Sequence, residues 1–142
     1  MSTSLNVKDY IPQREPFLFV DQVVDHTQES VTTTFAVKES ADFFKGHFPG
    51  NPIMPGVLTC EAVFQTGALL MALSSGETLA GKTAVVTRIQ SAKFKNMARP
   101  GDTLNIKVDL VEKIANASFM KGKVDVAGKT ILTLEFACAL AE

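Results

Sequence analysis

The 142-residue sequence has few cysteines and no excess of either charge, and each shortage excludes a class of protein. The two cysteines, Cys60 and Cys138, are too few and too far apart for a disulfide framework or a zinc-binding motif. Lys and Arg number 14 against 15 Asp and Glu, so the chain lacks the basic surface that is typical of nucleic-acid-binding proteins. We therefore expect no nucleic-acid partner and no metal site.

The sequence also lacks a segment that would carry it into or across a membrane. Its most apolar run, residues 68–73, is much shorter than the roughly 20 residues that span a bilayer. Residues 1–8 are polar and contain no apolar core of the kind found in secretory signals. We therefore expect a cytoplasmic protein with reduced cysteines, and a single domain over residues 1–142.

The most unusual stretch of the chain is residues 47–65, which read HFPGNPIMPGVLTCEAVFQ. His47 begins a turn rich in proline and glycine, and residues 55–74 then follow the pattern of a helix that is apolar on nearly every side. Such a helix is usually buried. Yet it contains Glu61 and Gln65, which lie on one helical face because they are four residues apart. A buried unpaired carboxylate is costly, so Glu61 needs a partner or a function, and His47 is the nearest candidate.

The rest of the sequence has the patterns of β-strands and turns. Apolar, β-branched and aromatic residues predict strands at residues 17–24, 30–37, 83–94, 103–114, 118–126 and 130–140. Gly76 is a suitable stop for the helix. A single apolar helix must be covered, and an antiparallel sheet curled round it does so with short connections. The expected fold is α+β, with one long buried helix wrapped by about six strands, an arrangement known as the hotdog fold.

Residues 47–65 resemble the signature of the FabZ-type 3-hydroxyacyl-acyl-carrier-protein dehydratases of fatty-acid biosynthesis. The similarity extends along almost the whole chain, through residues 12–21, 46–49, 52–58, 93–95 and 100–102. It implies a catalytic pair at His47 and Glu61, where Glu instead of Asp is similar to the branch that only dehydrates. It also implies a homodimer, or a larger homo-oligomer of dimers, with sites built across the interface. The implied partner is an acyl carrier protein that presents the substrate on a phosphopantetheine arm, and no other cofactor is expected.

The chain departs from the family pattern at four positions, none of them in the catalytic pair: Gln13, Phe64, Asn96 and Met97. Gln13 stands where a histidine is frequent, and Phe64 stands where a small residue is usual. A bulky Phe64 can narrow the tunnel for the acyl chain. It therefore affects which chain lengths we expect the protein to accept, and not which reaction.

The residues of this stretch suit the dehydration of a 3-hydroxyacyl thioester. The reaction removes a weakly acidic proton beside the carbonyl and expels hydroxide from the next carbon, so it needs a base and an acid. A histidine, with an ordinary pKa of about 6.5, suits the role of base for His47. Burial should raise the pKa of Glu61, which can then donate a proton. The Gly56 N–H at the helix start can donate to the thioester oxygen, and Gln65 is expected to orient the Glu61 carboxyl.

Other interpretations of these residues stay open at the level of sequence. Glu61 can belong to a structural ion pair with Arg88 or Lys93, and Cys60 is more simply a packing residue than a nucleophile. The protein can be a thioesterase of the same fold, in which Glu61 activates water, or a non-catalytic acyl-binding module. Lys93, Lys95 and Arg99 can form a basic stripe that binds an acidic carrier protein. Alternatively, they are the charged side chains of a solvent-facing strand edge.

Overall fold

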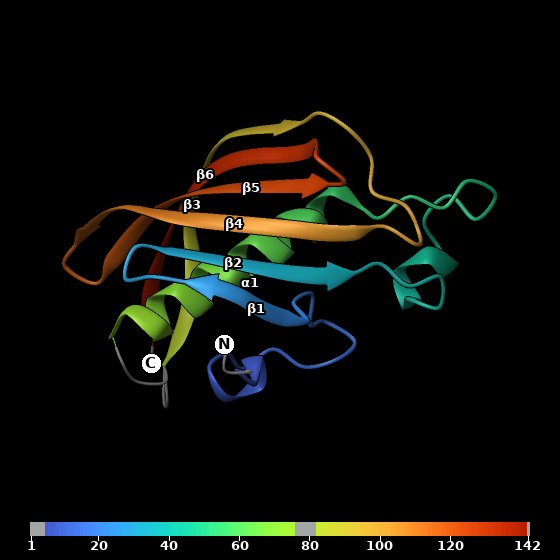
Figure 1. Ribbon diagram of the computed structural model, residues 1–142. Helices are drawn as coiled ribbons and strands as arrows, with labels where there is room; N and C mark the ends of the chain where they lie inside the picture. Colours follow the sequence, from blue (N-terminus) through green and yellow to red (C-terminus); the bar gives the residue numbers. More distant parts are fainter. Residues whose placement is uncertain (1–4, 76–81, 142) are drawn as a thin grey trace.

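One long helix lies inside a curled sheet in the computed structural model, which describes residues 5–75 and 82–141 (Figure 1). The helix is α1 (Gly56–Ser75), and two short 3-10 helices are η1 (Val7–Asp9) and η2 (Asp42–Lys45). The strands are β1 (Gln22–His26), β2 (Ser30–Ala36), β3 (Thr83–Phe94), β4 (Thr103–Ile114), β5 (Ala117–Val126) and β6 (Lys129–Ala141). They form one open antiparallel sheet in the order β1-β2-β4-β5-β6-β3. The predicted α+β arrangement of helix and sheet is confirmed.

The strand predicted at residues 17–24 is wrong over its first part, because β1 begins only at Gln22. Backbone groups of Phe17 and Phe19 bond to a side chain of α1 instead of to a strand. Gln65 Nε2 donates to the Phe17 carbonyl oxygen at 3.0 Å, and the Phe19 N–H donates to Gln65 Oε1 at 2.8 Å. These bonds lay the segment along the helix. The other five predicted strands agree with the structure, and Gly76, the predicted helix stop, lies outside the described residues.

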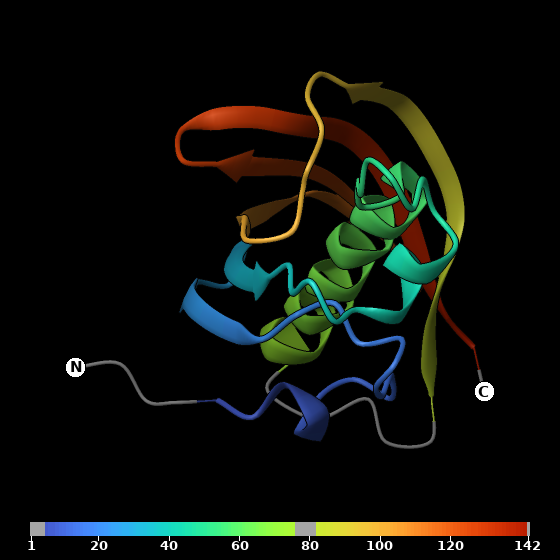
Figure 2. The ribbon, with the colours of Figure 1, turned by 90° about the vertical axis from the view of Figure 1, so that its right-hand side faces the viewer.

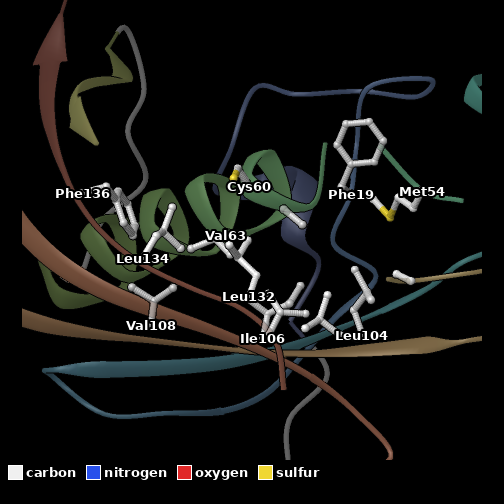
Figure 3. Packing of buried hydrophobic residues seen from close by; sticks show 14 of the residues in the cluster. Phe19, Met54, Cys60, Val63, Leu104, Ile106, Val108, Leu132, Leu134 and Phe136 are labelled. Atoms are coloured by element: carbon white, nitrogen blue, oxygen red, sulfur yellow. The ribbon is translucent and has the colours of Figure 1, made fainter. Parts of the chain in front are cut away.

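The helix α1 forms the centre of the core. By length and composition alone it could cross a membrane, but most of it is buried inside the protein. Figure 3 shows Val63 of α1 among inward-pointing side chains of the sheet, including Ile106, Leu132 and Leu134. Along β4 and β5 buried residues alternate with outward-facing ones such as Lys107, Lys121 and Lys123, which is the period of a strand with one buried face.

Two glycines allow α1 and the sheet to approach each other closely. A Cβ on Gly122 of β5 would collide with Cγ1 of Val63, and a Cβ on Gly67 of α1 would lie 2.8 Å from Cζ of Phe136 on β6. Because interiors are close-packed, a methyl group at either position would force the helix or its neighbours to move. These contacts fix how α1 sits on the sheet, and therefore where its first turns lie.

The strand β3 forms one edge of the sheet and pairs only with β6. It is 12 residues long, and its exposed apolar side chains are Val85, Val86, Ile89 and Phe94. A long apolar edge strand offers unpaired backbone groups to another chain, and native proteins usually cover such an edge.

Candidate active site

The imidazole of His47 lies half-buried in the turn between η2 and α1, with one ring nitrogen bonded to the backbone. Its Nδ1 lies 2.7 Å from the carbonyl oxygen of Ile53. A carbonyl oxygen can only accept, so Nδ1 carries the hydrogen and the neutral ring has its lone pair on Nε2. The backbone therefore selects the tautomer that a general base acting through Nε2 requires.

The turn that carries His47 is held in an unusual conformation. Phe48 has a φ of 53°, in the left-handed region that bulky residues rarely adopt. Its carbonyl oxygen accepts from the Asn51 N–H at 2.8 Å, and its ring lies against the His47 ring with centroids 4.4 Å apart. Further along the turn, the Met54 N–H donates to the Ala98 carbonyl oxygen at 2.8 Å. Strained backbone of this kind persists only where surrounding contacts fix it, and it is often found at functional sites.

The side chains of Glu61 and Gln65 touch, as their spacing predicts. Gln65 Nε2 donates to Glu61 Oε2 at 3.0 Å. The direction of the Gln65 amide is fixed by its other partners, because the Phe19 N–H can only donate and the Phe17 carbonyl can only accept. The amide oxygen must therefore face Phe19, and the amide nitrogen must face Phe17 and the carboxyl. Gln65 is completely buried, and its bond with the Phe19 N–H is buried with it, whereas its bonds to Phe17 and Glu61 are part-buried.

Glu61 is a half-buried carboxyl whose hydrogen-bond partner is an amide. Burial raises its pKa above the ordinary value, and the hydrogen bond from Gln65 offsets part of that rise. None of the ion pairs in residues 5–75 and 82–141 includes Glu61, so the alternative pairing with Arg88 or Lys93 is not formed. A carboxyl with a raised pKa can hold a proton for donation.

The two cysteines near Glu61 are packing residues. Both are buried. Burial, and secondarily the nearby Glu61 charge, raise the pKa of the Cys60 thiol and raise that of Cys138 to about 12. A thiol acts as a nucleophile only as a thiolate, so neither cysteine is suited to nucleophilic catalysis at neutral pH.

The first turn of α1 presents backbone N–H groups that the helix itself does not use. The Pro55 carbonyl oxygen accepts from the N–H groups of Leu58 at 2.9 Å and Thr59 at 3.1 Å. Within the described part of the chain, no backbone hydrogen bond uses the N–H of Gly56 or Val57. These donors lie at the positive end of the helix dipole, where an oxygen that gains negative charge is stabilised.

The predicted site residues fall into two groups in one chain. Glu61, Gln65 and Gly56 share α1, and His47 is joined through Ile53 to the turn that leads into Gly56. Across the residues that the structure describes, no hydrogen bond or ion pair joins His47 to Glu61. Nor does any group of three His, Cys, Asp or Glu side chains in these ranges have the arrangement of a metal site.

The basic residues predicted as a stripe take part in different contacts. Lys93 lines a shallow hollow on the outer face of the sheet, together with Lys107, Lys121 and Lys123. Arg99 instead lies beside the active-site turn, where its Nη1 donates to Asn51 Oδ1 at 2.8 Å. Docking of a carrier protein on this stripe stays a prediction.

The arrangement of helix and sheet is the hotdog fold, which solved structures of other proteins share. A chain of the dehydratase heterocomplex ApeI:P from Xenorhabdus doucetiae superposes with a TM-score of 0.82 at 16% identity, covering 97% of this chain and 92% of that chain. A hypothetical thioesterase from Streptococcus pneumoniae TIGR4, solved with coenzyme A, superposes with a TM-score of 0.63 at 18% identity, covering 84% of each chain. At these identities the likeness establishes the fold alone.

Sequence similarity identifies the protein family of the chain. The FabA-like domain matches residues 11–135. The 3-hydroxyacyl-[acyl-carrier-protein] dehydratase FabZ of Caulobacter vibrioides is 40% identical over 133 residues, which cover 93% of this chain and 84% of that protein. The chain therefore belongs to the FabA-like family, and within it to the FabZ-type dehydratases, which confirms the resemblance drawn from residues 47–65.

Proposed function

We propose that this protein converts (3R)-3-hydroxyacyl thioesters of an acyl carrier protein to trans-2-enoyl thioesters in fatty-acid biosynthesis. Family membership supports the reaction class. The observation that carries the proposal is the Glu61 carboxyl, which burial favours in its protonated form and whose partner among the described residues is the Gln65 amide. An acyl-binding module needs no such acid, and a thioesterase does not need a histidine whose tautomer is fixed.

In the proposed reaction, His47 Nε2 takes the proton from the carbon beside the thioester carbonyl. The electron pair of that C–H bond moves toward the thioester oxygen, whose growing charge the Gly56 N–H stabilises. The pair then forms the new C=C bond as the C–O bond of the 3-hydroxyl breaks, and Glu61 supplies the proton that lets the oxygen leave as water. The imidazolium and the carboxylate that result return to their starting states by proton exchange.

We further propose that the working unit is a homodimer, or a larger assembly of dimers, with His47 of one copy facing Glu61 of the other. Two observations support this: no bond joins the two side chains within one chain, and β3 is a long apolar edge strand. Val57, beside Gly56 at the helix start, is 73% exposed in the single chain and suits burial against a second copy. The substrate arrives on the phosphopantetheine arm of the carrier protein, no further cofactor takes part, and the reaction takes place in the cytoplasm.

The proposal is tested by incubating the protein with a 3-hydroxyacyl carrier-protein thioester and following the loss of one water by mass spectrometry. We expect dehydration by the wild type, and its loss in His47→Ala and Glu61→Gln. His26→Ala is the matched control, because His26 is the other histidine of the chain and lies exposed at the end of β1. Release of free thiol in place of the enoyl product would show hydrolysis and contradict the proposal.

A further inference from the structure

Gly56 is in close contact with the ring of Phe94. If Gly56 carried a Cβ, that atom would lie 2.9 Å from Phe94 Cε1, 3.2 Å from Cδ1 and 3.5 Å from Cζ, and these three ring atoms are its nearest neighbours. The backbone of Gly56 does not have a positive φ, so conformational freedom does not explain the glycine. An alanine N–H would donate as well as a glycine N–H. The absence of a side chain at position 56 is therefore explained by the ring.

The backbone pairing of β3 with β6 directs the Phe94 side chain toward Gly56. The pairing of β3 with β6 shifts register between Gln90 and Lys93, and Ser91 within that shift has a φ of 54°. Such an irregularity bends a strand and redirects the side chains that follow it. Beyond it, the Lys95 N–H donates to the Ile131 carbonyl oxygen at 2.8 Å, which fixes the chain just after Phe94 to β6. Figure 2 shows the end of β3 arching over the start of α1.

The ring lies at the helix start and is not buried in the core. Phe94 is 55% exposed, although it is a large apolar side chain on a well-anchored strand. It therefore forms an apolar wall beside Gly56, whose N–H has no backbone partner within residues 5–75 and 82–141. An apolar wall keeps water away from a hydrogen bond, and a hydrogen bond is electrostatically stronger where water is excluded.

We propose that Phe94 is a positioning residue for the thioester: it holds the first turn of α1 in place and shields the Gly56 N–H that binds the thioester oxygen. This inference rests on the proposed dehydratase function. It names a residue outside the catalytic pair, and it gives the position of Gly56 a steric reason.

The test compares Phe94→Ala, Phe94→Leu, Gly56→Ala and the double variant Gly56→Ala/Phe94→Ala with the wild type, measuring kcat and KM for a 3-hydroxybutyryl carrier-protein thioester. We expect Phe94→Ala to lower kcat by about tenfold or more with a smaller change in KM, because the donor acts mainly on the transition state. Phe94→Leu, which keeps apolar bulk, should recover part of the loss. The double variant should be no slower than Phe94→Ala, since the added methyl then occupies the space that the ring has left.

Ile114→Ala is the matched control, because Ile114 is also a strand residue with 53% of its surface exposed. Circular dichroism and thermal unfolding check that each variant is folded. Wild-type kcat in a folded Phe94→Ala, or losses in the double variant that multiply those of the two single variants, would overturn the inference while the dehydratase function stands. A wild type without dehydratase activity would overturn the proposed function itself, and the inference with it.

Discussion

At the scale of single residues, Gln65 connects the fold to the candidate chemistry. Its amide ties the segment that carries Phe17 and Phe19 to α1 and turns its nitrogen toward Glu61. The helical spacing predicts the contact with Glu61, but nothing in the sequence indicates the bonds to backbone groups 46 and 48 residues away. Those bonds also explain why residues that look like a strand are not one, because a side chain takes the backbone groups that a neighbouring strand would use.

Gln65→Leu tests this structural role. The substitution keeps most of the volume but removes the partner of the buried Phe19 N–H and of the part-buried Phe17 carbonyl. We expect the free energy of unfolding to fall by about 2–4 kcal/mol, because each buried unsatisfied group costs about 1–3 kcal/mol. Urea denaturation measures the change, with Gln28→Leu at an exposed position as the control. Equal stability of the two variants would contradict the role assigned to the amide.

Glu61→Gln tests the protonation state of the buried carboxyl. Because the pKa of Glu61 is raised by folding, folding favours the protonated form. The stability that this form contributes is fully present below the ordinary carboxyl pKa of about 4.3 and is lost as the pH rises through the raised folded value. A glutamine does not titrate, so the stability of the variant relative to the wild type should grow across that window.

The comparison is made by urea denaturation between pH 4 and pH 8, a range chosen to bracket the raised carboxyl pKa. Glu112→Gln, at an exposed position of β4, controls for the substitution itself. A stability difference that stays constant with pH, or that shrinks as the pH rises, would mean that the Glu61 pKa is not raised.

At the scale of elements, the sequence predicts both ends of β3 and β4 to the residue. The predicted ends of β2, β5 and β6 differ from the structure by at most one residue. Their alternating pattern is local, so a single sequence displays it. The closeness of α1 to the sheet is not local. It depends on Gly122 meeting Val63, a residue far away in the sequence, and a glycine within a strand does not by itself show which residue it faces.

Gly122→Ala tests the contact between α1 and β5. The new methyl would collide with Val63, so we expect a loss of about 1–3 kcal/mol in unfolding free energy. In a double-mutant cycle, Val63→Ala should remove part of this penalty, since it empties the space that the methyl needs. Gly46→Ala is the control, because a Cβ there would have no neighbour within 4 Å. Strict additivity of the two core substitutions would contradict the close approach.

At the scale of the whole molecule, a single chain contains both the base and the acid of the proposed reaction, but within its described residues no hydrogen bond joins them. His47 has the right tautomer but is not bonded to Glu61, and the β3 edge carries apolar side chains that a solvated strand would not favour. The family resemblance implies the dimer, whereas composition and periodicity do not, because an edge strand and a central strand can have the same pattern of residues.

Substitutions on the β3 edge test the proposed interface. Val86→Lys combined with Ile89→Lys places charges on exposed positions of the strand, which should block pairing with a second copy while leaving the core intact. We expect a folded monomer by circular dichroism and light scattering, with dehydratase activity lost. Val111→Lys, at another exposed apolar position, should leave the assembly unchanged. A double variant that keeps the wild-type assembly would place the interface elsewhere.

The most direct measurement mixes two inactive variants within one dimer. Co-expression of His47→Ala and Glu61→Gln chains with different tags, followed by purification on both tags, gives dimers in which one of the two symmetric sites has both side chains intact. We expect about half of the wild-type activity for this mixed dimer, because a two-fold axis relates its two sites. A mixed dimer as inactive as either parent variant would contradict a site in which the base of one chain acts with the acid of the other.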